Sequence, residues 1–146
     1  MSAIHRQQPA DAAAIAAYQR VLDRVYERSR ELIPAAPTWQ AGLYRSVLAC
    51  YAEMRSEPRV LELHFVATMR DPQVLRTRVQ HRDRLLALLA ATRDDAPDAL
   101  HGEFLLNLVH ASMRTQLRAG AEPPGLDAAE RTFAAILWRG APLSQA

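Results

Sequence analysis

Hydrophobic residues recur along this chain every three or four positions, and prolines and glycines separate one such stretch from the next. The first stretch shows the spacing clearly, with Ile15, Tyr18, Leu22 and Val25 on one side. A repeat of this period is typical of an α-helix that buries one face. No stretch alternates apolar and polar residues for long enough to indicate a β-strand. The pattern therefore predicts an all-α protein.

Helix-start and helix-stop signals predict a six-helix bundle. The helices are expected at residues 10–32, 39–55, 56–72, 72–91, 97–119 and 126–139. Thr38, Ser56 and Asp71 are expected to cap the second, third and fourth helices, because their side-chain oxygens can accept free N–H groups. Gly120 is expected to end the fifth helix.

The third and fourth helices are expected to pack differently. Residues 56–72, which read SEPRVLELHFVATMRDP, are apolar on almost every side. Such a helix normally has neighbours on several faces, so this segment is expected to be the hub of the bundle. The fourth helix is expected to bury only one side, which carries Leu75, Val79, Leu86 and Leu89, flanked by Val74, Leu85 and Leu88.

Composition narrows the classes of function. The 146 residues suit one helical domain, expected at 9–140, between a disordered segment at 1–8 and a tail at 141–146. All 18 basic residues are arginines scattered among 16 acidic residues, so no basic stripe for nucleic acid is expected. Cys50 is the single cysteine and is expected in the core. No apolar run approaches the roughly 20 residues of a membrane span, and we expect a cytoplasmic protein with no membrane partner.

Catalytic and metal-binding motifs are missing from the sequence. None of the five histidines lies four residues from another beside a glutamate, as in zinc proteases, and no Glu-x-x-His pair occurs. Glycine-rich phosphate loops and the Gly-x-Ser-x-Gly motif are also missing. We therefore expect neither an enzyme nor a metal or other cofactor.

Three polar residues fall on apolar helix faces. His64 lies among apolar residues of the third helix, and Asn107 and His110 lie near the apolar side of the fifth. Buried polar groups need partners, so one interpretation is that they bond to each other or to the backbone. The other is that they orient a ligand in a mostly apolar pocket. The residues expected to form its walls are Trp39, Tyr44, Tyr51, Phe65, Met69 and Met113.

The fifth helix carries a second apolar side. A helix with two apolar sides has two partners, one inside the subunit and one outside, unless both sides pack internally. The side of the fifth helix that an outside partner could cover carries Phe104, Leu108, Ala111 and Thr115, and the expected sixth helix offers Phe133 and Leu137. A two-fold contact between identical surfaces is the commonest arrangement of oligomers.

Two long segments resemble the regulatory domains of tetracycline-repressor-type (TetR family) transcription regulators. EPRVLELHFVATMRDPQVLRTRVQHRDRLLALLA combines an acidic-Pro pair, a short apolar helix and a longer arginine-rich helix. FLLNLVHASMRTQLRAGAEPPGLDAAERTFAAILWRGAPLSQA is similar to the last two helices of that family. The resemblance implies a C-terminal ligand-binding domain that forms homodimers through a four-helix bundle. It also implies that the dimer interface is formed together by Phe104, Leu108, Ala111, Thr115, Phe133 and Leu137. The helix-turn-helix of the family has no counterpart before Pro9, so DNA is expected to be bound only through a domain absent from this sequence.

These features predict a domain that senses a small, mostly apolar effector and forms a homodimer. Effector binding would favour one arrangement of the helices, and the first helix would transmit it to a DNA-binding domain. The alternative is a stand-alone helical interaction or dimerisation module with no ligand. A cavity beside Phe65 and His110 favours the sensor, whereas a filled core favours the module.

Overall fold

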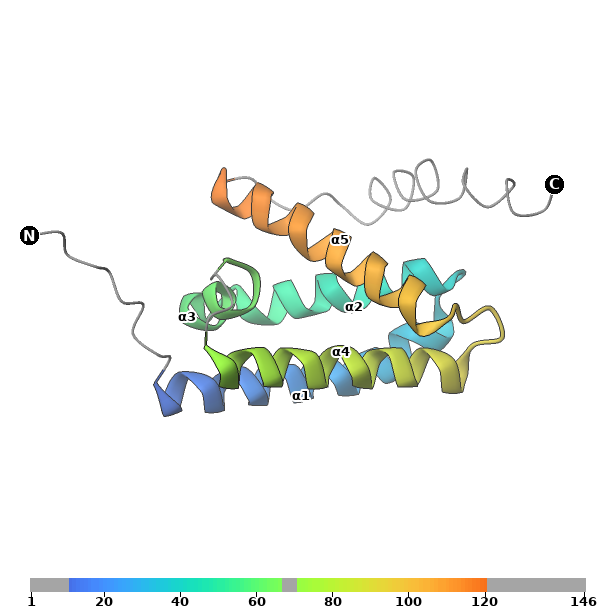
Figure 1. Cartoon of the computed structure of the whole chain (residues 1–146), viewed down its shortest axis with the longest axis horizontal. Coiled ribbons are helices and arrows are strands. Elements are labelled where there is room, and N and C mark those ends of the chain that lie inside the picture. The colour runs from blue at the N-terminus through green and yellow to red at the C-terminus, as the bar shows by residue number, and fades with distance from the viewer. Residues whose placement is uncertain (1–10, 67–70, 121–146) are drawn as a thin grey trace, which may run out of the picture.

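The computed structural model describes residues 11–66 and 71–120, which form helices and no β-strand (Figure 1). The elements are α1 (Ala12–Ala35), α2 (Trp39–Met54), α3 (Pro58–Leu61), a π-helical turn η1 (Glu62–Val66), α4 (Pro72–Thr92) and α5 (Ala99–Arg118). The all-α prediction is confirmed for these residues. The expected sixth helix at 126–139 lies outside them, as do the expected terminal segments at 1–8 and 141–146. No helix in the described part is long and apolar enough to cross a membrane.

Side-chain caps begin four of the five α-helices. In each case a side-chain oxygen accepts a backbone N–H from the first turn, and the capping residues are Asp11, Thr38, Asp71 and Asp98. Ser56 was expected to cap the third helix but does not, because its hydroxyl donates to the Glu53 carbonyl at 3.4 Å. α3 begins instead at Pro58, in the first turn, where a missing N–H costs nothing. Gly120 follows α5 with a φ of 73°, a left-handed conformation that ends helices.

α1 and α2 form an antiparallel hairpin, with α4 packed along α1 and α5 crossing above α2 and α4 (Figure 1). α3 and η1 lie at one end of this bundle, where they contact α1, α2 and α5. The described part of the expected hub therefore closes an end of the bundle and is not its central helix. It still reaches the core, because His64 and Phe65 are both buried, with 2% and 1% of their surface exposed.

The core lies between α1, α2, α4 and α5 and also receives η1. Its largest fully buried side chains are Tyr18, Ile33, Leu43, Met54, Phe65, Leu89 and Met113. Cys50 is buried as expected, and burial raises the pKa of its thiol. A buried thiol of this kind stays protonated and is a packing residue, not a nucleophile.

α4 buries Leu89 of the expected side and the flanking residues Val74 and Leu85, but the centre of its buried face differs from the expected one. Its buried residues are Val74, Thr77, His81, Leu85 and Leu89. Leu75 was expected inside, but 44% of its surface is exposed, and Val79 is only partly buried. Thr77 can be buried because its hydroxyl donates, at 3.0 Å, to the carbonyl four residues earlier. Counting apolar residues alone missed the centre of this face because Thr77 and His81 belong to it.

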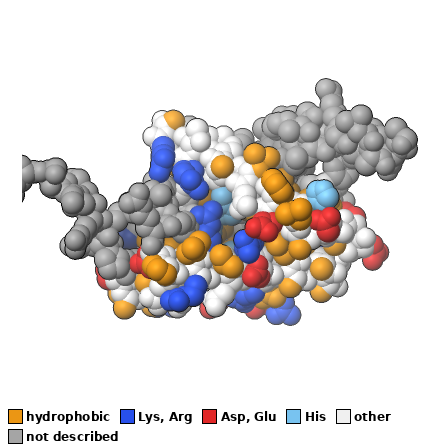
Figure 2. Space-filling view, viewed as in Figure 1, with side chains coloured by type: hydrophobic (Ala, Val, Ile, Leu, Met, Phe, Trp, Pro, Cys, Tyr) orange, Lys and Arg blue, Asp and Glu red, His pale blue; other side chains and the backbone are white. Residues whose placement is uncertain are grey.

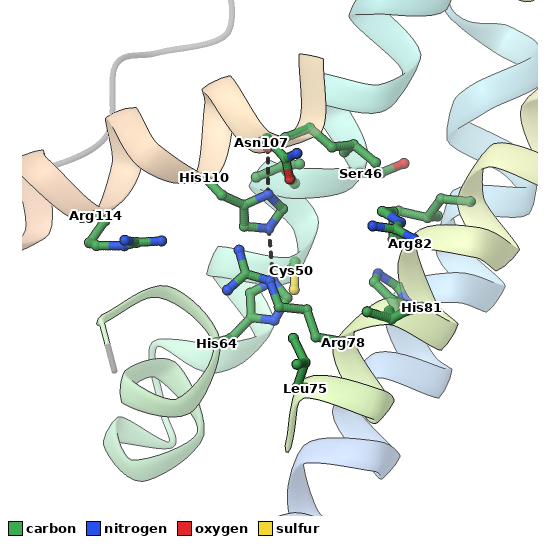
Figure 3. Close-up of a pocket in the computed structure, with 14 residues that line it drawn as sticks. Ser46, Cys50, His64, Leu75, Arg78, His81, Arg82, Asn107, His110 and Arg114 are labelled. Carbon is green, nitrogen blue, oxygen red and sulfur yellow. Dashed lines mark hydrogen bonds between the residues drawn. The ribbon is translucent and has the colours of Figure 1, made fainter. Parts of the chain in front are cut away.

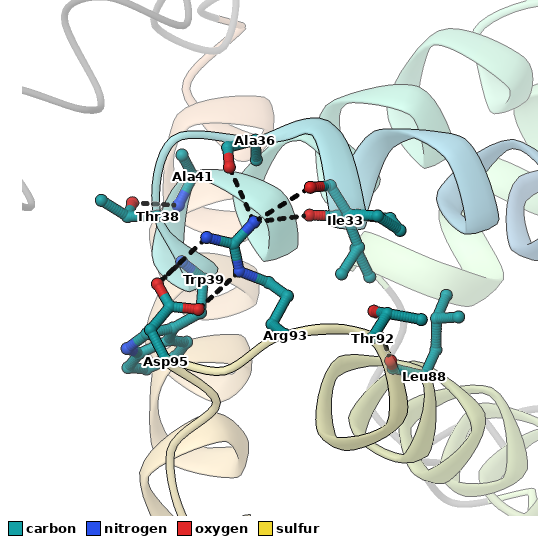
Figure 4. A network of polar contacts seen from close by, with 10 residues as sticks. Ile33, Ala36, Thr38, Trp39, Ala41, Leu88, Thr92, Arg93 and Asp95 are labelled. Carbon is teal, nitrogen blue, oxygen red and sulfur yellow. Dashed lines mark hydrogen bonds and ion pairs between the residues drawn. The ribbon is translucent and has the colours of Figure 1, made fainter.

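Arg93, which follows α4, joins the adjacent ends of α1 and α2 (Figure 4). Its Nη1 donates to the carbonyl oxygens of Ile33 at 2.9 Å and Ala36 at 2.7 Å, at the end of α1. Its Nε and Nη2 make two bonds to Asp95, of 2.6 and 3.0 Å. Asp95 also accepts the backbone N–H of Trp39 at 3.1 Å, and hydrogen bonds from Arg93 lower the pKa of the Asp95 carboxyl. This Arg93 network supplies partners to carbonyls at a helix end that helical bonds leave free.

Removing Arg93 should destabilise the fold. We expect Arg93→Ala to lower the free energy of unfolding by about 2–4 kcal/mol, because carbonyls and a carboxylate lose a shared charged donor. Arg93→Lys should recover only part of this loss, since lysine cannot reproduce the paired bonds to Asp95. Urea unfolding at pH 7, followed by circular dichroism, measures the change. The matched control is Arg76→Ala, at an exposed position of α4, and equal losses for Arg76→Ala and Arg93→Ala would contradict the assignment.

Candidate functional site

A cavity of about 260 Å³ lies where α2, η1, α4 and α5 meet (Figure 3). Its polar wall residues are Ser46, Cys50, His64, Arg78, His81, Arg82, Asn107, His110 and Arg114. Its apolar wall residues are Val47, Leu75, Val79, Leu85 and Leu106. The cavity is partly open to solvent, and its volume lies just below the roughly 300–1,000 Å³ common for ligand pockets. It suits a small molecule.

The cavity is lined by residues of both α4 and α5, and these two helices diverge along their length (Figure 1). Near the loop that joins them, Gly102 lies so close to α4 that a Cβ atom there would be 2.6 Å from Cδ2 of Leu86. Towards its C-terminal end α5 runs away from α4 and contacts η1 instead. The small residue thus lets the helices meet at one end, and their divergence leaves space at the other.

A chain of hydrogen bonds runs from α1 through η1 to α5. The Tyr18 hydroxyl lies 2.5 Å from Nδ1 of His64, and Nε2 of His64 lies 3.0 Å from Nε2 of His110. Nδ1 of His110 lies 2.7 Å from the Leu106 carbonyl oxygen. Phe65 supports the pair from behind, with its ring stacked on His110 at a centroid distance of 5.5 Å. The His64–His110 pair therefore links η1 to α5.

The carbonyl at one end fixes the protons of this chain. A carbonyl oxygen only accepts, so Nδ1 of His110 must carry a proton and donate to Leu106. If both rings are neutral, Nε2 of His110 then accepts from Nε2 of His64. Nδ1 of His64 is left to accept the proton of the Tyr18 hydroxyl. Every ring nitrogen of the pair is thus satisfied without any charge.

Burial keeps these histidines neutral. It is the largest cause that lowers the pKa of His64 well below the ordinary value, with the charge of His110 adding to it. Burial and the nearby Arg78 lower the pKa of His110 to about 4, despite its bond to the Leu106 carbonyl. Burial and Arg84 likewise lower the pKa of His81 to about 4. At neutral pH the pair acts as a polar but uncharged wall of the cavity.

Among the described residues, three arginines and no carboxylate line the cavity. Arg82 is neutralised, because it makes a 3.0 Å ion pair with Glu103 on α5 and a 3.1 Å pair with Asp83. Arg78 and Arg114 make no hydrogen bond or ion pair with any residue in the described ranges, and Nε of Arg114 is buried without a partner there. The cavity therefore has a positive side that the described chain leaves uncompensated.

The structure brings together some of the expected ligand-binding residues. His64, Asn107 and His110 line the cavity. The expected wall residues that do not line it are Trp39, Tyr44, Tyr51, Phe65 and Met113. Phe65 backs the His64–His110 pair, and Tyr51 packs edge-on against Phe65 at 6.2 Å. Met69 lies outside the described residues. The two interpretations of His64 and His110 therefore coexist, since they bond to each other and also face the cavity.

Sequence reasoning missed the charged side of the cavity. Arg78, His81 and Arg82 occupy one side of α4 at helical spacing, as Asn107, His110 and Arg114 do on α5. Polar residues that recur three or four positions apart, next to an apolar stripe, are a usable signal for a polar wall. Which two helices face each other across a space cannot be read from that spacing.

One face of α5 is apolar and exposed. Leu100, Phe104 and Leu108 follow one another at four-residue intervals, with 62%, 68% and 47% of their surfaces exposed. Ala111 and Thr115 continue this face and are also exposed. Figure 2 shows hydrophobic side chains gathered over α5, beside the part of the surface where arginine and histidine side chains meet. Phe133 and Leu137, expected in the same interface, lie outside the described residues.

Neither a metal site nor a known relative explains the cavity. Among residues 11–66 and 71–120, no three histidine, cysteine or acidic side chains come together in a way that could hold a metal ion. No family model, curated protein or solved structure matches the chain. The case for a function therefore rests on the cavity and on the exposed face of α5.

The neutral histidines should make stability depend on pH. In the unfolded chain a histidine has a pKa near 6.5, whereas His81 and His110 have pKa values of about 4 in the fold. The unfolded state then binds more protons, so stability is complete above pH 6.5 and falls as the pH drops towards 4. We expect a loss of about 2 kcal/mol for each of these histidines by pH 5. Urea unfolding at pH 7.5, 6 and 5 measures it, and His81→Gln should flatten the slope. A free energy of unfolding that does not change over this range would contradict neutral burial.

Proposed function

We propose that this domain binds a small molecule and senses its presence. The observation that carries the proposal is the cavity between α2, η1, α4 and α5, where polar groups converge within partly apolar walls. The cavity is lined by α4 and α5, which diverge (Figure 1), so an occupant would contact both helices at once. This combination supports a sensor better than a rigid scaffold.

The output of the sensor is proposed to be of the TetR type. Segments 57–90 and 104–146 resemble TetR regulatory domains, and the described helices agree with that resemblance in their all-α character. In this proposal the effector favours one arrangement of α4 and α5, and α1 transmits the change to a DNA-binding domain. Specific DNA binding would then require a separate helix-turn-helix domain.

The exposed face of α5 is proposed to form a homodimer. It offers a row of apolar side chains, of which Phe104 is the most exposed. A stable interface needs more than roughly 1,000 Å² with an apolar centre, and the row supplies such a centre. The same row also supports a second function, a helical interaction module that needs no ligand. The cavity favours the sensor, because a pure interaction module has no use for one.

A side chain that fills the cavity should abolish ligand binding. Val79 lines the cavity and is partly buried, so Val79→Phe should occupy the space while the helices stay intact. A thermal-shift screen of small metabolites on the wild type identifies ligands, and a ligand at about 100 times its Kd adds about 2.7 kcal/mol of stability. We expect that gain to vanish in Val79→Phe and to persist in Ala91→Phe, at an exposed position of α4. If no metabolite stabilises the wild type, or if both variants respond equally, the sensor proposal fails.

A charge on the apolar face of α5 should separate the dimer. Leu108→Glu places a carboxylate in the proposed interface, where no partner would compensate its loss of water. Sedimentation at tens of micromolar should show a wild-type dimer and a monomeric variant, with Ala91→Glu remaining dimeric. A monomeric wild type would exclude the homodimer. If Leu108→Glu then also lost stability, the face would be covered within the chain itself.

A further inference from the structure

The positive side of the cavity is built from two arginines on different helices. Arg78 belongs to α4 and Arg114 to α5, and in Figure 3 the side chain of Arg114 extends towards Arg78. Burial and the nearby charge of Arg114 both lower the pKa of Arg78. Like charges in a half-buried space repel each other. No group among the described residues compensates these two charges.

Carboxylates are present near the cavity but serve another arginine. Glu103 and Asp83 both pair with Arg82, and neither lines the cavity. A third group also lacks a partner within the described ranges, since His81 is only 7% exposed and its Nδ1 is buried without a hydrogen bond. Two guanidinium groups and one ring nitrogen, all without partners in the described chain, thus border the same space.

We infer that the ligand is a small organic carboxylate, whose carboxyl group is held by Arg78 and Arg114 and whose body contacts the apolar wall. This inference rests on the proposed sensor function and names the ligand class of the same site. A guanidinium group matches a planar carboxylate, because it can donate two parallel N–H bonds. Val79, Leu85 and Leu106 provide the apolar surface for the body of the ligand.

A phosphate fits this site less well than a carboxylate. Phosphate sites normally use backbone N–H groups at a helix N-terminus or in a glycine-rich loop. Here the walls come from residues within helices, whose N–H groups are already bonded along the helix. A second negative charge would also cost more to strip of water in a half-buried space.

Matched pairs of acid and amide test the inference on the full 146-residue chain. Benzoate and hexanoate are compared with benzamide and hexanamide by isothermal titration, with phenyl phosphate as a further probe. We expect the acids to bind at least about tenfold more tightly than the amides, as charge-assisted hydrogen bonds imply. Arg78→Gln should weaken the acids about tenfold, and Arg114→Gln should act in the same direction. Arg76→Gln removes the same charge from an exposed position of α4 and should change the affinity less than about twofold.

The contrary outcomes separate this inference from the sensor proposal. Amides that bind as tightly as acids would overturn the carboxylate while leaving a small-molecule sensor in place. Phenyl phosphate that binds more tightly than benzoate, through Arg78, would overturn the carboxylate in favour of a phosphate ester. Equal losses in Arg78→Gln and Arg76→Gln would show a general charge effect and no site. If none of the five compounds binds, the inference is overturned, and the metabolite screen on Val79→Phe decides the sensor proposal separately.

Discussion

The fold depends on the Arg93 network. This network connects the segment that follows α4 to the end of α1 and to the start of α2. The guanidinium group of Arg93 serves the carbonyls of Ile33 and Ala36 and also orients Asp95, which in turn holds the first N–H of α2. At this end of the bundle α5 also approaches α4 closely, through Gly102. At the other end, α5 is held to η1 by the bond between His64 and His110. The end of the bundle near Arg93 is therefore held by charged hydrogen bonds. The end near η1 is held by the bond between two neutral histidines, and the cavity lies beside that bond.

The arginines also differ in whether a carboxylate pairs with them. Arg93 and Arg82 have their carboxylates, whereas Arg78 and Arg114 have none among the described residues. Leaving two partly buried cations unpaired reduces stability, and a protein of this size has little stability to spare. Such an arrangement is reasonable where a ligand supplies the missing charge. The neutral histidines fit the same account, because a protonated pair would add more positive charge to the same wall.

The sequence was sufficient to predict α1, α2, α4 and α5. It did not predict the short α3 with its π-helical turn, or the helix faces that meet. Proline, threonine and aspartate positions predicted where α2 and α4 begin, because capping is a local property of a few residues. The buried face of α4 was only partly predicted, since Thr77 and His81 are polar yet buried, and only the packed structure shows that. His64, Asn107 and His110 could be singled out because polar residues on apolar faces are unusual. Arg78 and Arg114 looked like ordinary surface arginines, since nothing local tells that α4 and α5 diverge there.

The geometry also suggests why a ligand between Arg78 and Arg114 would have an effect beyond its own site. The two residues belong to helices that meet at Gly102 and diverge beyond it, so an anion held by both would pull the diverging part of α5 towards α4. The apolar row that is proposed to dimerise lies on that same helix. A rotation or shift of α5 would change how two such rows face each other, while the Arg93 network keeps the end of α1 joined to the start of α2. Interfaces of this kind respond to small helix shifts by changing their packing. Ligand binding in the cavity and the geometry of the proposed dimer would then be coupled, because both would depend on the angle between α4 and α5.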